Sequence, residues 1–172
     1  MTARLTVRRE SWPLAQPFTI SRGSRSASEV VVAEIVAGGE RGRGECVPYP
    51  RYGETIEAVA AAIERMGAAV AKGIDRARLQ AAMPPGAARN AIDAALWDLA
   101  AKRERTNAAT LAGQGDMRPL VTAYTLSLDT PERMGAAAAA HRDRPLLKLK
   151  LTGDGDIERV RAVRRGAPGS RL

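Results

Sequence analysis

Cysteine and histidine are almost absent from this sequence. It contains one of each, Cys46 and His141, in a chain of 172 residues. A single cysteine cannot form a disulfide within the chain, so we expect a reducing, cytoplasmic setting. A single histidine excludes a zinc site made of cysteine and histidine ligands and argues against Ser–His or Cys–His catalysis. Any chemistry must therefore rest on other side chains, and we expect Cys46 to be a buried core residue.

Aromatic residues and long apolar runs are also scarce. Aromatic residues make up 3% of the chain and apolar residues 45%, so a core must consist mainly of alanine and aliphatic side chains. No uninterrupted apolar run approaches the roughly 18 residues that a membrane span needs. The charged residues 4–10 lack the apolar segment of a signal peptide. We therefore expect neither a membrane span nor a signal peptide.

Basic residues outnumber acidic ones, 27 against 19, which gives a net charge of +8. Such a charge permits long-range attraction of phosphates, carboxylates or nucleic acid. The basic residues are scattered, mostly arginine, and lack the interleaved aromatic residues on which bases stack. The pattern favours an arginine-rich surface without nucleic-acid binding. Nucleic-acid binding stays an alternative, which predicts retention of DNA that falls steeply with salt.

The first two thirds of the chain predict a β-meander followed by helices. Residues 3–14 alternate as a strand, and residues 16–28, rich in serine, glycine and arginine, are predicted to be a loop. Residues 29–48 predict a hairpin that turns at a Gly-Gly pair. The spacing of apolar residues predicts a helix over 56–73, capped by Thr55 and closed by glycine, and two further helices over 75–83 and 87–104. The small residues of the last helix indicate close packing, and we expect its Trp97 and Asp98 to serve packing and anchoring.

The pattern changes near Arg118, where strands and helices begin to alternate. This alternation predicts an α/β fold with parallel βαβ units and marks a domain boundary. Thr130 is the expected N-cap of the first helix, with Pro131 at its first position. The predicted elements are a strand over 118–128, a helix over 130–142, a strand over 145–151, a helix over 156–166 and the start of another strand at 170–172.

Two lysines, Lys148 and Lys150, share one face of the strand over 145–151. Taken alone, such a face is ordinarily solvated. In a βαβ sheet both faces are covered, so the alternating Leu147, Leu149 and Leu151 would face the helices and the lysines a barrel interior. Two ammonium groups about 7 Å apart along a strand disfavour each other's charge. Lysines in that situation can act as a base near neutral pH.

Four stretches of the chain carry a family resemblance when they are taken together and in order. They are FTISRGSRS, GRGECVPYPRYGET, PPGAARNAIDAALWDLAAKR and LLKLKL. Together they resemble the dipeptide epimerases that act on L-Ala-D/L-Glu, in the mandelate racemase and muconate-lactonizing branch of the enolase superfamily. The resemblance covers the N-terminal half of such a protein. It implies an α+β capping domain over residues 1–117 and the truncated first part of a modified, TIM-like (β/α) barrel over residues 118–172.

The same resemblance implies roles for the lysine strand. Lys150 would remove or return the proton alpha to the substrate carboxylate, while Lys148 would help to position that carboxylate and favour the neutral amine of Lys150. Mg²⁺ would stabilise an enediolate, but its carboxylate ligands and a second acid/base lysine are expected beyond Leu172. This chain alone should therefore hold no metal ligand and be inactive. Asp154 and Asp156 are expected to cap the next helix or to favour its N-terminal dipole.

Substrate-binding residues are expected in two loops and at one strand end. Arg22 and Arg25, in the first loop, could grip a dipeptide carboxylate bidentately, Arg25 being preferred. Tyr49 and Tyr52, in the second loop, could shape the pocket. Thr125, at the end of the first barrel strand, could contact the substrate. Each has a plainer alternative: a solvated arginine, packing on the capping domain, or an ordinary strand-end threonine.

Other functions stay open at this point. A cycloisomerase or an o-succinylbenzoate synthase-like member of the superfamily would use the same lysines. The loop arginines and the PRYGET stretch favour the epimerase. A non-catalytic fragment or interaction module is the alternative outside enzymes. A short parallel sheet with an open edge leaves backbone N–H and C=O groups unpaired. We therefore expect either self-association as a homo-oligomer or further residues of the protein that cover this edge.

Overall fold

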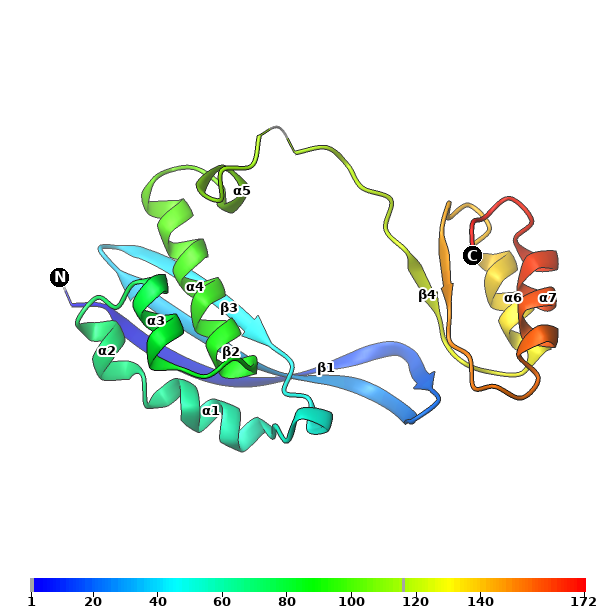
Figure 1. The fold of residues 1–172 in the computed structure, drawn as a ribbon, viewed down its shortest axis with the longest axis horizontal. Coiled ribbons are helices and arrows are strands. Elements are labelled where there is room, and N and C mark those ends of the chain that lie inside the picture. The colour runs from blue at the N-terminus through cyan, green and yellow to red at the C-terminus, as the bar shows by residue number, and fades with distance from the viewer. Residues whose placement is uncertain (1, 116) are drawn as a thin grey trace. The chain divides into compact units, whose positions relative to one another are not determined.

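The computed structural model describes residues 2–115 and 117–172. The chain forms two compact units (Figure 1). The first consists of Met1–Trp12 and Ser28–Met117, and the second of Pro13–Ala27 and Arg118–Leu172. The division after Met117 lies where strands and helices begin to alternate. The second unit thus joins two segments that are far apart in the sequence.

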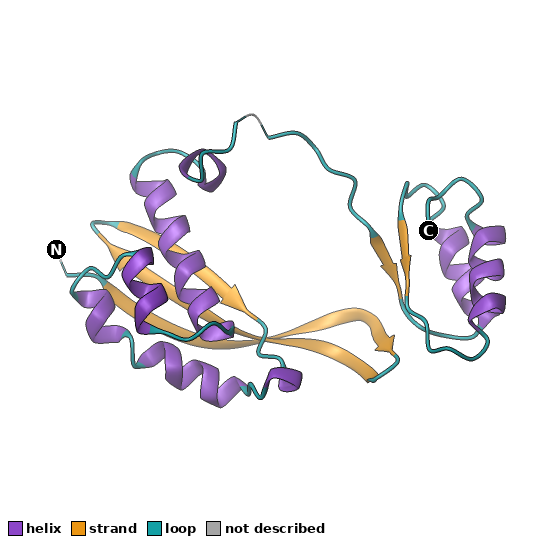
Figure 2. Ribbon diagram, in the orientation of Figure 1, coloured by secondary structure: helices purple, strands orange, loops and turns teal. Residues whose placement is uncertain are grey.

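A three-stranded sheet in the order β1-β2-β3 supports the first unit (Figure 2). Strand β1 spans Arg4–Ile20, β2 spans Gly23–Ala37 and β3 spans Glu40–Cys46. Strands β2 and β3 pair antiparallel around Gly38 and Gly39, whose φ values of 63° and 85° favour glycine. This confirms the predicted Gly-Gly hairpin.

The loop predicted over residues 16–28 is wrong. Strands β1 and β2 continue through most of it, and only Ser21 and Arg22 form the turn between them. Phe18, Thr19 and Ile20 are residues that favour strands, and a two-residue turn suffices to join antiparallel neighbours. The segment is therefore the tip of a long hairpin.

The three helices predicted for the first unit lie close to their predicted positions, whereas the short helix Ala108–Leu111 was not predicted. Thr55 Oγ1 accepts a hydrogen bond from the Ala58 N–H at 3.1 Å, as predicted for a cap. The single helix predicted over 56–73 is divided before Gly67, since glycine is a weak helix former, and Gly73 follows the second part with φ 78°. The helices are α1 (Ile56–Glu64), α2 (Gly67–Ala71), α3 (Arg76–Ala82), α4 (Ala87–Arg103) and α5 (Ala108–Leu111), with a 3-10 turn η1 at Pro50–Tyr52.

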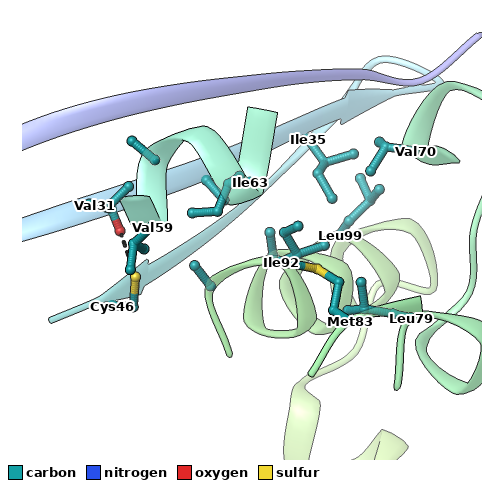
Figure 3. Packing of buried hydrophobic residues seen from close by; sticks show 14 of the residues in the cluster. Val31, Ile35, Cys46, Val59, Ile63, Val70, Leu79, Met83, Ile92 and Leu99 are labelled. Atoms are coloured by element: carbon teal, nitrogen blue, oxygen red, sulfur yellow. Dashed lines mark hydrogen bonds between the residues drawn. The ribbon is translucent and has the colours of Figure 1, made fainter. Parts of the chain in front are cut away.

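The core of the first unit lies between these helices and one face of the sheet (Figure 3). Val31 and Ile35 of β2 meet Ile63 of α1 and Ile92 of α4, and none of the four is more than 1% exposed. Cys46 is 5% exposed in the same cluster, which confirms it as a core residue. The scarcity of aromatic residues is thus met by a core of small and aliphatic side chains.

Close contact between α4 and β3 depends on two glycines. A Cβ atom on Gly42 would overlap the carbonyl oxygen of Ala95, and one on Gly44 would overlap that of Ala91. The backbones of strand and helix therefore meet without side chains between them. This confirms the close packing predicted from the small residues of the helix.

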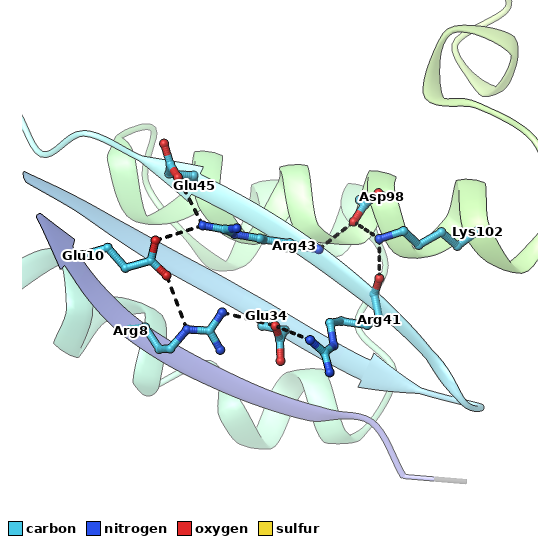
Figure 4. A network of polar contacts seen from close by, with 8 residues as sticks. All are labelled: Arg8, Glu10, Glu34, Arg41, Arg43, Glu45, Asp98 and Lys102. Atoms are coloured by element: carbon cyan, nitrogen blue, oxygen red, sulfur yellow. Dashed lines mark hydrogen bonds and ion pairs between the residues drawn. The ribbon is translucent and has the colours of Figure 1, made fainter. Parts of the chain in front are cut away.

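The opposite face of the sheet carries a network of ion pairs (Figure 4). Glu34 is only 8% exposed, and its carboxylate lies 3.3 Å from Arg8 Nη2 and 3.6 Å from Arg41 Nη1. Arg43 Nη2 lies 3.0 Å from Glu10. A buried carboxylate needs such partners, because an unpaired charge away from water is costly.

Asp98 ties α4 to β3, as predicted. Its Oδ2 accepts hydrogen bonds from the Arg43 backbone N–H at 2.8 Å and from Lys102 Nζ at 2.7 Å. Burial opposes ionisation of Asp98, but these hydrogen bonds and the Lys102 charge outweigh it and lower the pKa of the carboxyl. Trp97 packs under the Arg76 guanidinium, 3.4 Å from the ring centroid, which agrees with its predicted packing role.

The second unit contains the alternating elements. Strand β4 (Tyr124–Leu126) pairs parallel with β5 (Leu147–Leu149), and helices α6 (Pro131–Ala140) and α7 (Asp156–Gly166) follow them. Leu146 forms an isolated parallel bridge with Arg171, which confirms the predicted start of a third strand. Both strands are shorter than predicted, since only three residues of each pair with the other. Thr130 accepts from the Arg133 N–H at 3.4 Å and Pro131 opens α6, as predicted.

A separate small core holds the second unit together. Leu126, Met134, Leu147 and Val163 are each at most 2% exposed, and Leu149 packs against them. Leu147 and Leu149 thus face the helices as predicted. The prediction was wrong for Leu151, which lies beyond the end of β5 and is 42% exposed. No helix in the described part of the chain is long and apolar enough to cross a membrane.

Candidate functional site

Strands β4 and β5 place Thr125 beside Lys148. The two residues are partners in the parallel register, between the pairs Tyr124–Leu147 and Leu126–Leu149. Because side chains alternate along a strand and the flanking residues join the core under α6 and α7, Thr125 and Lys148 lie on the opposite face. The structure therefore brings together two of the predicted site residues.

Lys150 follows β5 directly and is half-buried, whereas Lys148 is exposed. The sequence pattern predicted both lysines inside one strand, but the strand ends at Leu149. Lys150 is therefore the first residue after the ladder of β4 and β5.

The tip of the β1–β2 hairpin is fastened to the end of β4. The Thr19 N–H donates to Ser127 Oγ at 2.8 Å, and the Leu128 N–H donates to the Thr19 carbonyl oxygen at 3.0 Å. This tip carries Arg22, which is exposed in the turn, and Arg25, whose guanidinium lies 6.0 Å from the Phe18 ring centroid. Both arginines thus belong to the same unit as Thr125 and the two lysines.

A cavity of about 440 Å³ lies between the hairpin tip, β4 and α6. Thr125 and Ser127 line it, together with Asp129, Arg133 and His141. Neither lysine is among its lining residues. The cavity is thus adjacent to the predicted site through Thr125 alone.

Tyr52 belongs to the first unit. It lies in η1, is 75% exposed, and its ring centroid is 5.6 Å from that of Tyr49. The loop is fastened by Glu54, whose carboxylate accepts from the Tyr49 N–H at 2.9 Å and from the Ala87 N–H at 2.7 Å. Glu54 thereby supplies the side-chain cap that α4 lacks at Gly86.

The loop after β5 is closed by Asp156. Its carboxylate accepts from the backbone N–H groups of Thr152 at 3.1 Å and Gly153 at 2.6 Å. The pKa of Asp156 is lowered, mainly by the hydrogen bond from the Thr152 N–H. Burial acts in the opposite direction, and the hydrogen bonds from Gly153 and Arg159 lower the pKa further. Gly155 occupies the cap position without a side-chain bond, so neither Asp154 nor Asp156 caps α7. Asp156 lies in the first turn, where its charge favours the N-terminal dipole, and this confirms the second alternative for that residue.

The family of this chain is shown by a match to a family model. The model describes the N-terminal domain of mandelate racemase and muconate lactonizing enzyme, and it matches residues 2–113. The chain belongs to this family.

Individual relatives agree with this assignment. The chain is 44% identical, over 165 residues, to the L-Ala-D/L-Glu epimerase of Escherichia coli K12; the match covers 95% of this chain and 51% of that protein. A solved enolase family member from Agrobacterium tumefaciens, with homology to dipeptide epimerases and bound sodium and L-Ala-L-Glu, superposes with a TM-score of 0.93 at 50% identity. That match covers 98% of this chain and 52% of the other.

A third relative carries a metal. The dipeptide epimerase of Enterococcus faecalis V583, complexed with Mg and L-Leu-L-Tyr, gives a TM-score of 0.84 at 30% identity; the match covers 96% of this chain and 51% of the other. The chain thus spans about half the length of the relatives that it matches. The family match confirms the predicted α+β capping domain of the enolase superfamily.

Metal-binding groups are dispersed in the part of the chain that the structure describes. Within residues 2–115 and 117–172, no three histidine, cysteine, aspartate or glutamate side chains come together in a way that could hold a metal ion. The residues present therefore do not fit a Mg²⁺ site of the family.

Sequence reasoning missed two residues at the site, Thr19 and Ser127. Ser127 lies two positions after Thr125, so strand alternation places it on the same face, and this signal could have found it. Thr19 fell in the segment predicted to be a loop, where no partner could be assigned.

Proposed function

We propose that this chain forms the N-terminal half of a Mg²⁺-dependent dipeptide epimerase that acts on dipeptides of the L-Ala-D/L-Glu type. The enzyme would transfer the alpha proton of the C-terminal residue. The Escherichia coli relative and the neighbour bound to L-Ala-L-Glu support dipeptides of this type, and the neighbour bound to L-Leu-L-Tyr supports dipeptides as a class. The proposal treats residues 1–117 as the capping domain and residues 118–172 as the start of the barrel.

One observation carries the proposal. Thr125 and Lys148 are neighbours on the face of the sheet opposite α6 and α7, and Lys150 follows at the end of β5. In (β/α) barrels, groups at the carboxyl ends of parallel strands face the reaction site. A lysine there, half-buried and next to a second lysine, suits a proton-transfer group.

The chemistry assigned to Lys150 is a proton transfer. Its neutral amine takes the alpha proton, the C–H bond breaks, and the electron pair passes into the carboxylate as an enediolate. A second acid, on the opposite face and outside this chain, returns a proton to the alpha carbon and inverts it. For the opposite epimer the two groups exchange roles, so Lys150 then donates its proton.

The remaining residues are assigned to substrate binding. The ammonium of Lys148 attracts the reacting carboxylate, and Thr125 offers a hydroxyl beside it. Arg25, with Arg22, attracts the carboxylate of an acidic side chain from the hairpin tip. Tyr52, in η1, is likewise proposed as a substrate-binding residue.

Mg²⁺ would be held by groups outside this chain, since the residues described here do not fit it. We also place the enzyme in a reducing, cytoplasmic compartment, in keeping with the free and buried Cys46. The short β4–β5 sheet supports the expectation of a homo-oligomer, because its open edges can pair with strands of a second copy.

Exchange of the alpha proton for deuterium tests the function. The full-length polypeptide that carries this chain would be incubated with L-Ala-D-Glu or L-Ala-L-Glu and Mg²⁺ in D₂O, and the loss of the alpha-proton signal followed by NMR. We expect exchange with both epimers by the wild type and a loss of epimerisation of at least about 100-fold for Lys150→Ala. Lys72→Ala, which removes an exposed lysine of the first unit, is the matched control.

The possible outcomes separate the proposals. No exchange on any dipeptide by the wild type would remove the substrate class, and turnover of a cycloisomerase or o-succinylbenzoate synthase substrate would replace it. Residues 1–172 alone are expected to be inactive. Activity of this piece would contradict the assignment of the metal ligands and the second acid to another part of the enzyme.

A further inference from the structure

Asp156 and Arg159 form a pair at the start of α7. The Arg159 Nη1 lies 3.1 Å from Asp156 Oδ1, and the two side chains are only 18% and 19% exposed. On its other side, the Asp156 carboxylate holds the N–H groups of Thr152 and Gly153. The lowered pKa of Asp156 keeps this carboxylate ionised at neutral pH. The pair is therefore a charged and partly buried contact to the loop backbone.

Arg159 also reaches the loop that follows β4. Its Nε donates to the Asp129 carbonyl oxygen at 2.9 Å, and its Nη1 donates to the Asp154 carbonyl oxygen and, at 3.4 Å, to Thr152 Oγ1. One guanidinium thus binds acceptors in the loops after both β4 and β5. The two loops follow the carboxyl ends of neighbouring parallel strands, which carry Thr125 and Lys148.

Lys150 lies between two fixed parts of the chain. Strand pairing with β4 ends at Leu149, and the next backbone group held by a side chain is the Thr152 N–H. Beyond it, Gly153 and Gly155 adopt φ values of 109° and 70°, conformations that glycine reaches without strain. A loop with such glycines can adopt many backbone conformations, and the hydrogen bonds of Asp156 and Arg159 select one of these conformations.

We propose that Asp156 and Arg159 are positioning residues for Lys150. They fix the backbone immediately after it and couple that backbone to the loop after β4. Neither residue is assigned a contact with substrate; both act through the placement of the Lys150 amine. This inference rests on the proposed role of Lys150 in proton transfer.

The test uses the full-length enzyme with Arg159→Gln and Asp156→Asn, and Arg161→Gln as the control on the same helix. Arg161 is exposed, so its substitution should leave the kinetics unchanged. We expect kcat to fall by about 10- to 100-fold in both variants, since misplacement of a catalytic group by about 1 Å has such an effect. KM should change little, and the alpha-deuterium isotope effect on kcat should rise. Arg159→Lys should recover part of kcat. Lysine keeps the positive charge of Arg159 but lacks the several N–H donors of the guanidinium.

Two further measurements keep the test decisive. If circular dichroism shows that Arg159→Gln does not fold, the kcat and KM values of Asp156→Asn and Arg159→Lys test the proposal in its place. Amide hydrogen exchange of the wild type requires no variant: the Thr152 and Gly153 amides should exchange slowly, and exchange as fast as in an unstructured peptide would overturn the pair's role.

Failure of this inference differs from failure of the function. If the wild type is active, Lys150→Ala is inactive and folded Arg159→Gln keeps its kcat, then the positioning role is wrong and the function stands. If Lys150→Ala retains full epimerisation, the role of Lys150 itself is wrong. A rise in KM with kcat unchanged would assign Arg159 to substrate binding and overturn the proposal.

Discussion

The two units of this molecule hold their strands in different ways. In the first unit, β2 and β3 pair over their shared length, and α4 lies directly on the glycines of β3. In the second unit, β4 and β5 pair over three residues each, and polar contacts fix the loops after both strands. The comparison indicates that backbone packing shapes the capping domain, while a few hydrogen bonds shape the candidate site.

The hydrophobic cores of the two units differ in size. Helix α7 exposes Ile157 at 63% and Val160 at 36%, on the unit whose sheet is short and open at its edges. The core of the first unit, in comparison, gathers residues from β2, β3 and helices α1 to α4. We therefore expect the first unit to be the more stable of the two.

The largest expected effect comes from breaking the packing of the first unit. Gly44→Ala places a Cβ atom against the Ala91 carbonyl oxygen, so strand and helix must separate. We expect a loss of about 3 kcal/mol in the free energy of unfolding, measured by urea denaturation. Gly67→Ala is the matched control, because its Cβ meets no atom within 4 Å and it lies in α2, and it should stabilise by about 0.5 kcal/mol. Equal stability of Gly44→Ala and wild type would contradict the packing argument.

A smaller effect is expected from removing one of the two hydrogen bonds that fasten the hairpin tip to the end of β4. Ser127→Ala removes the acceptor of the Thr19 N–H and should cost the hairpin tip about 1 kcal/mol. Amide hydrogen exchange measures this locally: Thr19 should exchange faster, whereas the amides of β3 should not change. If Thr19 and Leu128 exchange at wild-type rates, the hairpin tip is held by other contacts.

Acid should weaken both units through carboxylates whose pKa is lowered, and Asp98 and Asp156 are an example from each unit. The pKa values of Asp98 and Asp156 are lowered in the folded chain. Their stabilising contributions are therefore complete above the ordinary carboxyl pKa of about 4 and are lost as the pH falls through the folded values. Urea midpoints measured between pH 7 and about pH 3 should fall, and Asp98→Asn should flatten the curve. A wild-type curve that stays level over this interval would rule out the assigned hydrogen bonds.

The smallest effect concerns reactivity without a change in stability. Burial, aided by the charge of Glu54, raises the pKa of the Cys46 thiol to about 11. The folded chain should therefore react slowly with iodoacetamide at pH 8, and urea should expose the thiol at the unfolding of the first unit. Rapid reaction of the native chain would show that this core opens readily.

Local patterns of the sequence predicted the elements whose causes are local. Thr55 and Thr130 cap their helices as expected, and the Gly-Gly pair turns the hairpin. The hairpin tip was missed, because strands rich in serine and arginine resemble loops until their pairing partner is known. The glycines of β3 gave no signal by themselves, since their role depends on the helix that lies on them.

The candidate site was predictable in its residues but not in its supports. Alternation placed the leucines and lysines on opposite faces, and Leu147 and Leu149 follow it. The support from Arg159 joins a residue of α7 to Asp129, 30 positions earlier, and no periodicity reports such a contact. Side chains that bind distant backbone groups become visible only in the structure.

The role of Lys150 is best tested by following the alpha proton in the Lys150→Ala enzyme, one epimer at a time. We predict that the wild type exchanges both L-Ala-L-Glu and L-Ala-D-Glu, and that Lys150→Ala loses exchange of the epimer whose proton Lys150 removes, while retaining more of the other. Exchange of both epimers at wild-type rates by Lys150→Ala would contradict the assignment of Lys150 as the proton-transfer group.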